Sequence, residues 1–68
     1  MENRLKVHRA KKDLTQKELA KQMDVSRQTI NAIETGKYDP SLELALKLAE
    51  YFDTSVEEIF MWEGEYGW

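Results

Sequence analysis

Apolar residues recur along the chain at the three- and four-residue spacing of amphipathic helices, in segments separated by short polar turns. The pattern predicts helices over about residues 4–12, 15–23, 26–35, 41–52 and 54–60. Asn3 can cap the first, and a serine or threonine stands where each of the others begins. Thr15 and Glu18 also have the spacing of a capping box. Since 68 residues leave room for one core, we expect a single domain over residues 1–68.

The third predicted helix, 26–35, has a buried stripe and a polar face. Ile30 and Ile33 form the inward pair, and Gly36 supplies the left-handed residue that ends helices at low cost. At about 100° per residue the outward arc is polar and almost free of acid. It carries Arg27, Gln28, Asn31, Ala32 and Thr35, whereas Glu34 falls beside the buried stripe.

The fourth predicted helix, 41–52, is apolar on two sides. Six apolar residues make one broad face: Leu42, Ala45, Leu46, Leu48, Ala49 and Phe52. Leu44 and Tyr51 lie together near the opposite side, so that only a narrow polar arc remains. This distribution predicts a second buried surface, and domains of this size often use a partner subunit for stability.

The remainder of the chain gives weaker signals. Val56, Ile59 and Phe60 fit a short fifth helix that is capped by Thr54 or Ser55. At the start of the tail, Phe60 and Trp62 alternate with Met61 and Glu63, which favours a short strand over residues 60–63.

The net charge of the chain is −3, which taken alone disfavours nucleic acid as a partner. Its distribution reverses that inference. Residues 1–38 hold nine Lys or Arg against five Asp or Glu, whereas residues 39–68 hold one against eight. The basic half contains the first three predicted helices, and the acidic half contains the fourth and fifth.

Composition excludes several classes of protein. Without Cys and with a single His, the chain has no disulfide framework and no zinc cluster. No apolar run approaches the roughly 18 residues of a membrane span, and the start of the chain lacks a signal-peptide stretch. We expect a cytoplasmic protein with no membrane contact, metal or cofactor. The same composition offers no nucleophile and base set, so an enzyme has the least support.

The chain has two short predicted helices joined by a three-residue turn, and the second has a polar and acid-poor face. In this arrangement the second helix can be held in the major groove of DNA. The arrangement asks for a small residue where the helices cross, which Ala20 supplies. It also asks for a turn residue that tolerates positive φ, a condition that Asp24 meets. Residues 15–35 therefore have the pattern of a helix-turn-helix.

Four motifs give the chain a resemblance to a known family. They are Leu14-Thr15-Gln16-Lys17-Glu18-Leu19-Ala20, Val25-Ser26-Arg27-Gln28-Thr29-Ile30, Ile33-Glu34-Thr35-Gly36-Lys37-Tyr38 and Pro40-Ser41-Leu42. With them the chain resembles the Cro/C1-type (XRE) helix-turn-helix regulators, and its ending resembles compact dimeric repressors such as the cytolysin repressor. The resemblance implies an all-α, five-helix, lambda-repressor-like DNA-binding domain. The two termini could add a small antiparallel β extension, with Val7 or its neighbours against residues 60–62.

The resemblance also implies roles for single residues. Gln16 would grip a phosphate and brace the recognition helix. Arg27 and Gln28 would face base edges, where Arg suits guanine and Gln suits adenine, and Asn31 would read a base or a phosphate. The other implied phosphate contacts are Ser26, Thr29, Lys37 and Tyr38.

Two further sets of residues have expected structural roles. Arg9 and Glu34 match a pair that in this family forms an internal ion pair between the first and third helices. Region 42–63 is expected to form the dimer contact, although the same side chains could be the chain's own core. The expected contacts are Leu44, Tyr51, Phe60, Met61 and Trp62.

These observations predict a transcriptional regulator that binds double-stranded DNA as a homodimer, and in particular a repressor. Helix 26–35 would enter the major groove of a pseudo-palindromic operator. No small-molecule ligand is evident. The alternative is an antitoxin-like or co-regulator module whose acidic, aromatic half binds a protein partner and whose DNA contact is weak.

Overall fold

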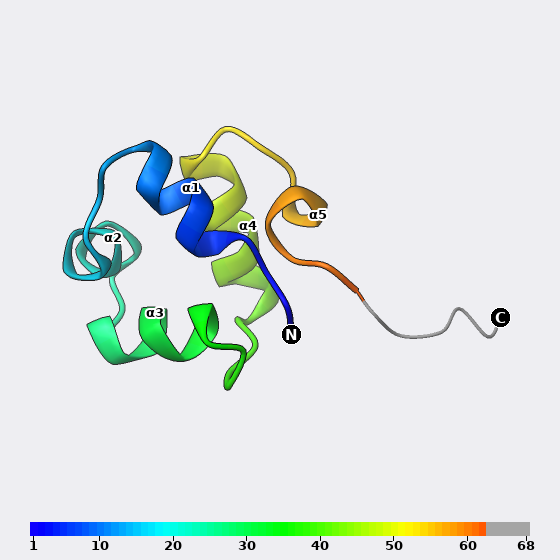
Figure 1. Ribbon diagram of the computed structural model, residues 1–68, viewed down its shortest axis with the longest axis horizontal. Coiled ribbons are helices and arrows are strands. Elements are labelled where there is room, and N and C mark those ends of the chain that lie inside the picture. The colour runs from blue at the N-terminus through cyan, green and yellow to red at the C-terminus, as the bar shows by residue number, and fades with distance from the viewer. Residues whose placement is uncertain (63–68) are drawn as a thin grey trace, which may run out of the picture.

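The computed structural model describes residues 1–62, which form five helices (Figure 1). They are α1 (Leu5–Lys11), α2 (Gln16–Met23), α3 (Arg27–Glu34), α4 (Leu42–Tyr51) and α5 (Val56–Ile59). Every predicted helix is present and slightly shorter than predicted, because the flanking cap residues are not themselves helical. The all-α prediction is confirmed. No helix in this part of the chain is long and apolar enough to cross a membrane.

A capping box starts α2, as the sequence predicted. The Thr15 hydroxyl accepts a hydrogen bond from the backbone N–H of Glu18 at 3.0 Å, and the Glu18 carboxylate accepts one from the backbone N–H of Thr15 at 2.8 Å. The bonds with the backbone and side chain of Thr15 lower the pKa of Glu18, because they favour its ionised form. Two donors that a helix start leaves without partners are thereby satisfied.

Serines precede the next three helices, but only two of them cap through the side chain. Ser26 and Ser41 each accept a bond of 3.1 Å from the backbone N–H three residues on. Ser55, rather than Thr54, is the residue before α5, and its hydroxyl makes no such bond. Tertiary contacts must therefore contribute more to the position of α5 than its cap does.

A residue with left-handed backbone conformation follows each of the first four helices. Asp24 closes α2 with a φ of 59°, as the helix-turn-helix requires, and Gly36 follows α3 with a φ of 77°. Asp13 and Asp53 have positive φ as well, at 58° and 53°. Aspartate is one of the few residues with a Cβ that adopts this conformation without a large penalty.

The core takes side chains from all five helices. Ile30 and Ile33 are fully buried, which confirms them as the inward pair of α3. The other fully buried large side chains are Leu5 of α1, Leu19 of α2, Leu48 of α4 and Ile59 of α5. Because α3 is anchored by this stripe, its opposite face is left at the surface.

The predicted faces of α4 are only partly right: Ala45, Leu48, Ala49 and Phe52 are buried as expected, but the other members of that face are not. Leu42 and Leu46 were expected on the buried side and are 74% and 54% exposed, whereas Leu44 was expected opposite and is buried in the core. The buried side is centred on Leu48, because α2 and α5 pack against α4 there. The sequence of α4 has two apolar arcs, and periodicity alone does not indicate which of them faces α2 and α5.

The two ends of the described chain pair with each other, in a different register from the expected one. Asn3 forms a single antiparallel bridge with Phe60. The backbone N–H of Arg4 donates to Ile59 O at 2.7 Å, and that of Met61 donates to Glu2 O at 3.0 Å. Val7 lies within α1 and takes no part, because the helix begins at residue 5. The short strand expected over residues 60–63 is reduced to this one bridge at Phe60 within the described residues, which end at residue 62.

Candidate nucleic-acid interface

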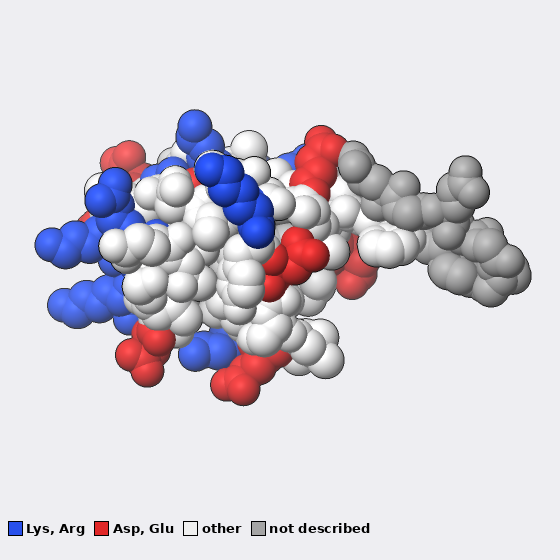
Figure 2. All heavy atoms as spheres, turned by 90° about the horizontal axis from the view of Figure 1, so that it is seen from below, with Lys and Arg blue, Asp and Glu red and all other residues white. Residues whose placement is uncertain are grey.

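The helix-turn-helix consists of α2, the turn at residues 24–26 and α3, and it forms one end of the molecule (Figure 1). The view from the α3 side shows Lys and Arg side chains projecting from this end (Figure 2). Much of the surface facing the viewer is uncharged, although acidic side chains also appear at its edges. An uncharged strip beside basic side chains suits a ligand that has polar edges and a charged backbone.

Three predicted base readers share one depression on α3. Arg27, Gln28 and Asn31 line it, and its volume is about 250 Å³. A second depression of about 430 Å³ also contains Arg27 and extends to the start of α2. Its other lining residues are Arg9, Thr15, Gln16 and Lys17. Gln16 and Arg27, eleven positions apart in the chain, therefore lie at one surface.

The carboxylate of Glu34 connects three helices. The guanidinium of Arg9 donates from Nε to Glu34 Oε2 at 2.8 Å and from Nη2 to Oε1 at 3.2 Å. Gln16 Nε2 donates to the same Oε1 at 3.0 Å. The side chain of Glu34 is only 4% exposed and that of Arg9 only 15%, so solvent screens the pair weakly. The hydrogen bond with Glu34 raises the pKa of Arg9, against an opposing effect of burial.

Gln16 also fixes one of the predicted readers. Its Nε2 lies 3.1 Å from Asn31 Oδ1, so that the amide of Asn31 is held from the α2 side. Asn31 Nδ2 has no hydrogen-bond acceptor within residues 1–62. Asn31 is exposed and can therefore present this donor outward.

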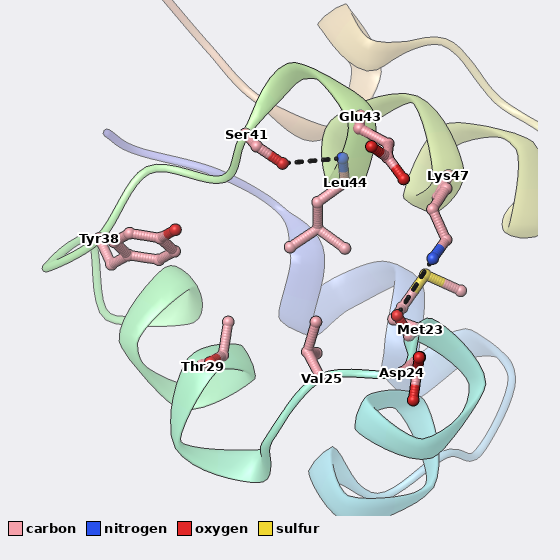
Figure 3. Close-up of a pocket in the computed structure, with 9 residues that line it drawn as sticks. All are labelled: Met23, Asp24, Val25, Thr29, Tyr38, Ser41, Glu43, Leu44 and Lys47. Carbon is pink, nitrogen blue, oxygen red and sulfur yellow. Dashed lines mark hydrogen bonds between the residues drawn. The ribbon is translucent and has the colours of Figure 1, made fainter.

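Three of the predicted phosphate contacts, Ser26, Thr29 and Tyr38, lie on the side of α3 that faces α4. Ser26 and Thr29 share a hydroxyl hydrogen bond of 2.9 Å at the start of α3. Thr29 does not line the reader depression; it lines a hollow of about 410 Å³ between the turn and α4 (Figure 3). Tyr38 lines the same hollow and is half exposed. The other lining residues are Met23, Asp24, Val25, Ser41, Glu43, Leu44 and Lys47.

The segment after α3 is held by its own backbone. The N–H groups of Lys37 and Tyr38 both donate to Ala32 O, at 2.9 and 3.2 Å. The side chain of Lys37 is exposed. The loop thus follows the end of α3 closely, and a shift of that end would carry Lys37 and Tyr38 with it.

Sequence reasoning missed two residues of this region. Lys47 Nζ donates to Met23 O at 3.2 Å and so attaches α4 to the end of α2 (Figure 3). No local pattern identifies that partner, which is 24 residues away. Lys17 lines the depression of Gln16 and Arg27, and its place in the first turn of α2 beside Gln16 was an available signal.

The expected dimer contacts do not all lie at the surface. Leu44 and Phe60 are 8% and 7% exposed and belong to the chain's own core, the alternative that the sequence left open. Tyr51 and Met61 are half-buried, and Tyr51 also receives Lys12 Nζ 5.1 Å from its ring centre. Trp62 is 61% exposed. Of the five expected contacts, Trp62 therefore presents the largest exposed fraction, and Leu44 and Phe60 present the smallest.

Comparison with known proteins identifies the class of this fold and surface. A family model described as helix-turn-helix matches residues 5–59. An uncharacterized HTH-type transcriptional regulator of Methanocaldococcus jannaschii is 57% identical over 65 residues, which cover 96% of this chain and 98% of that protein. A Bacillus subtilis regulator of the same description is 43% identical over 65 residues, with the same coverage.

A solved structure agrees with these relatives. The SOS-response transcriptional repressor LexA from Eubacterium rectale superimposes with a TM-score of 0.74 at 30% identity, and the match covers 94% of this chain and 77% of that one. The chain belongs to the Cro/C1-type (XRE) helix-turn-helix transcriptional regulators. These are DNA-binding proteins and not enzymes, so this chain functions in transcriptional regulation through double-stranded DNA.

We predict that Glu34→Ala lowers the free energy of unfolding by about 3 kcal/mol, because it removes the only carboxylate partner of the part-buried Arg9 guanidinium in residues 1–62 and leaves it with the bond to Leu14 O. Urea unfolding followed by circular dichroism measures the change. The control is Glu50→Ala on the exposed side of α4, which should change stability by less than about 0.5 kcal/mol. Equal losses in the two variants would show that the buried network contributes nothing specific.

Proposed function

We propose that the chain is a sequence-specific transcriptional regulator that acts as a homodimer and inserts α3 into the major groove of a pseudo-palindromic operator. The observation that carries the proposal is the depression shared by Arg27, Gln28 and Asn31 on the outer face of a braced helix. These three side chains have different donor and acceptor patterns, and together they could contact a few adjacent base pairs. Reading of this kind requires a fixed helix, and the Glu34 network supports it.

Each reader has a chemically defined preference. Arg27 can donate two bonds to O6 and N7 of one guanine, and Gln28 can pair with N6 and N7 of an adenine. Asn31 would donate from Nδ2, because its Oδ1 already accepts from Gln16. The proposed phosphate contacts, which set register without reading sequence, are Gln16, Ser26, Thr29, Lys37 and Tyr38.

Exposed apolar side chains support the homodimer. Trp62, Leu42 and Leu46 are each more than half exposed, and Met61 beside Trp62 is half-buried. Such side chains cost free energy in water unless a partner covers them. In a two-fold symmetric dimer the recognition helices would enter half-sites roughly 34 Å apart on one side of the duplex.

Repression is the regulatory outcome that follows from DNA occupancy alone, whereas activation needs a further contact with the transcription machinery. The operator selected by the protein, placed across the promoter of a reporter gene, should therefore reduce expression when the protein is supplied. Arg27→Ala in the same system is the control and should restore it. A rise in expression with the unchanged protein would contradict repression.

We predict different effects for a reader and a phosphate contact. Selection from a random-sequence DNA pool should enrich a palindrome with the unchanged chain. Arg27→Ala should then reduce the discrimination at one position of each half-site by about 1 to 3 kcal/mol, because a two-pronged contact to one base is lost. Lys37→Ala should weaken binding evenly across sequences and lower its salt dependence.

Other outcomes of the selection bear on the proposal directly. Uniform losses from both variants would contradict the division of roles. No enriched palindrome at moderate salt would contradict sequence-specific binding and would favour the protein-interaction alternative. Capture of a protein partner by the acidic, aromatic half would then be the next measurement.

We predict that Trp62→Ala raises the dissociation constant of the dimer by about tenfold or more, since buried tryptophans often dominate subunit contacts. Sedimentation equilibrium over a range of concentrations measures it. Tyr38→Ala, which removes a half-exposed aromatic at the DNA side, is the matched control and should leave the dimer intact. A monomer at all concentrations of the unchanged chain would contradict the homodimer.

A further inference from the structure

Asn3 lies where the end of α3, the start of α1 and the segment after α5 meet. Its Nδ2 donates to Ile33 O at 2.8 Å, across 30 residues of sequence, and to Met1 O at 3.1 Å. Its Oδ1 accepts from the backbone N–H of Leu5, the first residue of α1, at 3.1 Å. Its backbone forms the bridge with Phe60. One half-buried residue therefore joins three elements.

The bond to Ile33 differs from the others at the end of α3. The last carbonyl groups of a helix have no partner within it. Those of Asn31 and Ala32 accept bonds from residues 35–38, which follow directly in the chain. Ile33 O accepts one such bond from Gly36 N at 3.0 Å and a second from Asn3. Asn3 thus attaches the end of the recognition helix to a distant part of the chain.

The residues around Asn3 are held in turn by the segment after α5. Arg4 N donates to Ile59 O and Met61 N donates to Glu2 O, at 2.7 and 3.0 Å. Trp62, the proposed subunit contact, follows directly. Short hydrogen bonds therefore connect the backbone beside Trp62, through Asn3, with the end of α3.

From this connection we infer that Asn3 is a positioning residue for DNA binding, which sets the end of α3 in a fixed relation to the segment of the subunit contact. The inference rests on the proposed function and deepens it. In a symmetric dimer the separation of the two recognition helices must match one turn of DNA. A side chain that attaches α3 to the subunit-contact segment fixes that separation.

The chemistry of asparagine suits this position. A single short side chain offers a donor for Ile33 O and an acceptor for Leu5 N–H. An ionised aspartate has only acceptors and would place a carboxylate oxygen against the Ile33 carbonyl. A serine can still accept the bond that starts α1, but it is too short to reach Ile33.

The test compares two DNA ligands, the selected palindrome and one isolated half-site. In Asn3→Asp and Asn3→Ser the preference for the palindrome over the half-site should fall roughly tenfold, the loss expected when a part-buried hydrogen bond is removed. A merely structural role would weaken both ligands alike. Asn3→Ser keeps the start of α1 capped, so that the test remains valid if Asn3→Asp does not fold.

The control is Ala10→Gly, which destabilises α1 at an exposed position near its other end, away from Asn3. It should leave the preference for the palindrome unchanged. Sedimentation of Asn3→Ser at the assay concentration should show a dimer.

Three results would overturn the inference. The first is an unchanged preference in both Asn3 variants. The second is a loss of preference that follows dissociation into monomers, since Asn3 would then support the dimer rather than position α3. The third is the absence of any selected palindrome with the unchanged chain, which would defeat the proposed function first and is recognised before any variant is made.

Discussion

The orientation of the recognition helix depends on one buried carboxylate. Burial of Ile30 and Ile33 holds α3 against the core, but apolar contacts are not directional and leave its rotation poorly defined. Glu34 supplies the direction, because a carboxylate almost removed from water must be paired in good geometry. Its partners, Arg9 and Gln16, come from α1 and α2, so the three helices are fixed relative to each other at one point.

This constraint separates the two faces of α3. The carboxylate of Glu34 is occupied with internal bonds, whereas the outer face of α3 presents Arg27 and Gln28 in a depression with no acidic lining residue. Gln16 of α2 contacts both groups of side chains, since its Nε2 donates to Glu34 and to Asn31. The net charge of −3 is a poor guide to the ligand, because nine of the ten Lys and Arg residues lie in residues 1–38, the part of the chain that contains the helix-turn-helix.

Much of the candidate site could be predicted because its members are close in sequence. Arg27, Gln28 and Asn31 share a face by helical periodicity alone, and Ser26 is recognisable as a cap. Asn3 and Lys47 could not be found in this way. Each binds a backbone carbonyl, which every residue has, so neither partner leaves a trace in the sequence.

The sequence by itself determined where the helices begin and end, the inward stripe of α3 and the left-handed turn at Asp24. Each of these depends on interactions within about one helical turn. The tertiary structure alone decided that Leu44 is buried while Leu42 is exposed, and that Asn3 rather than Val7 pairs with the chain after α5. Those outcomes depend on which elements pack side by side, and periodicity along one helix contains no information about its neighbours.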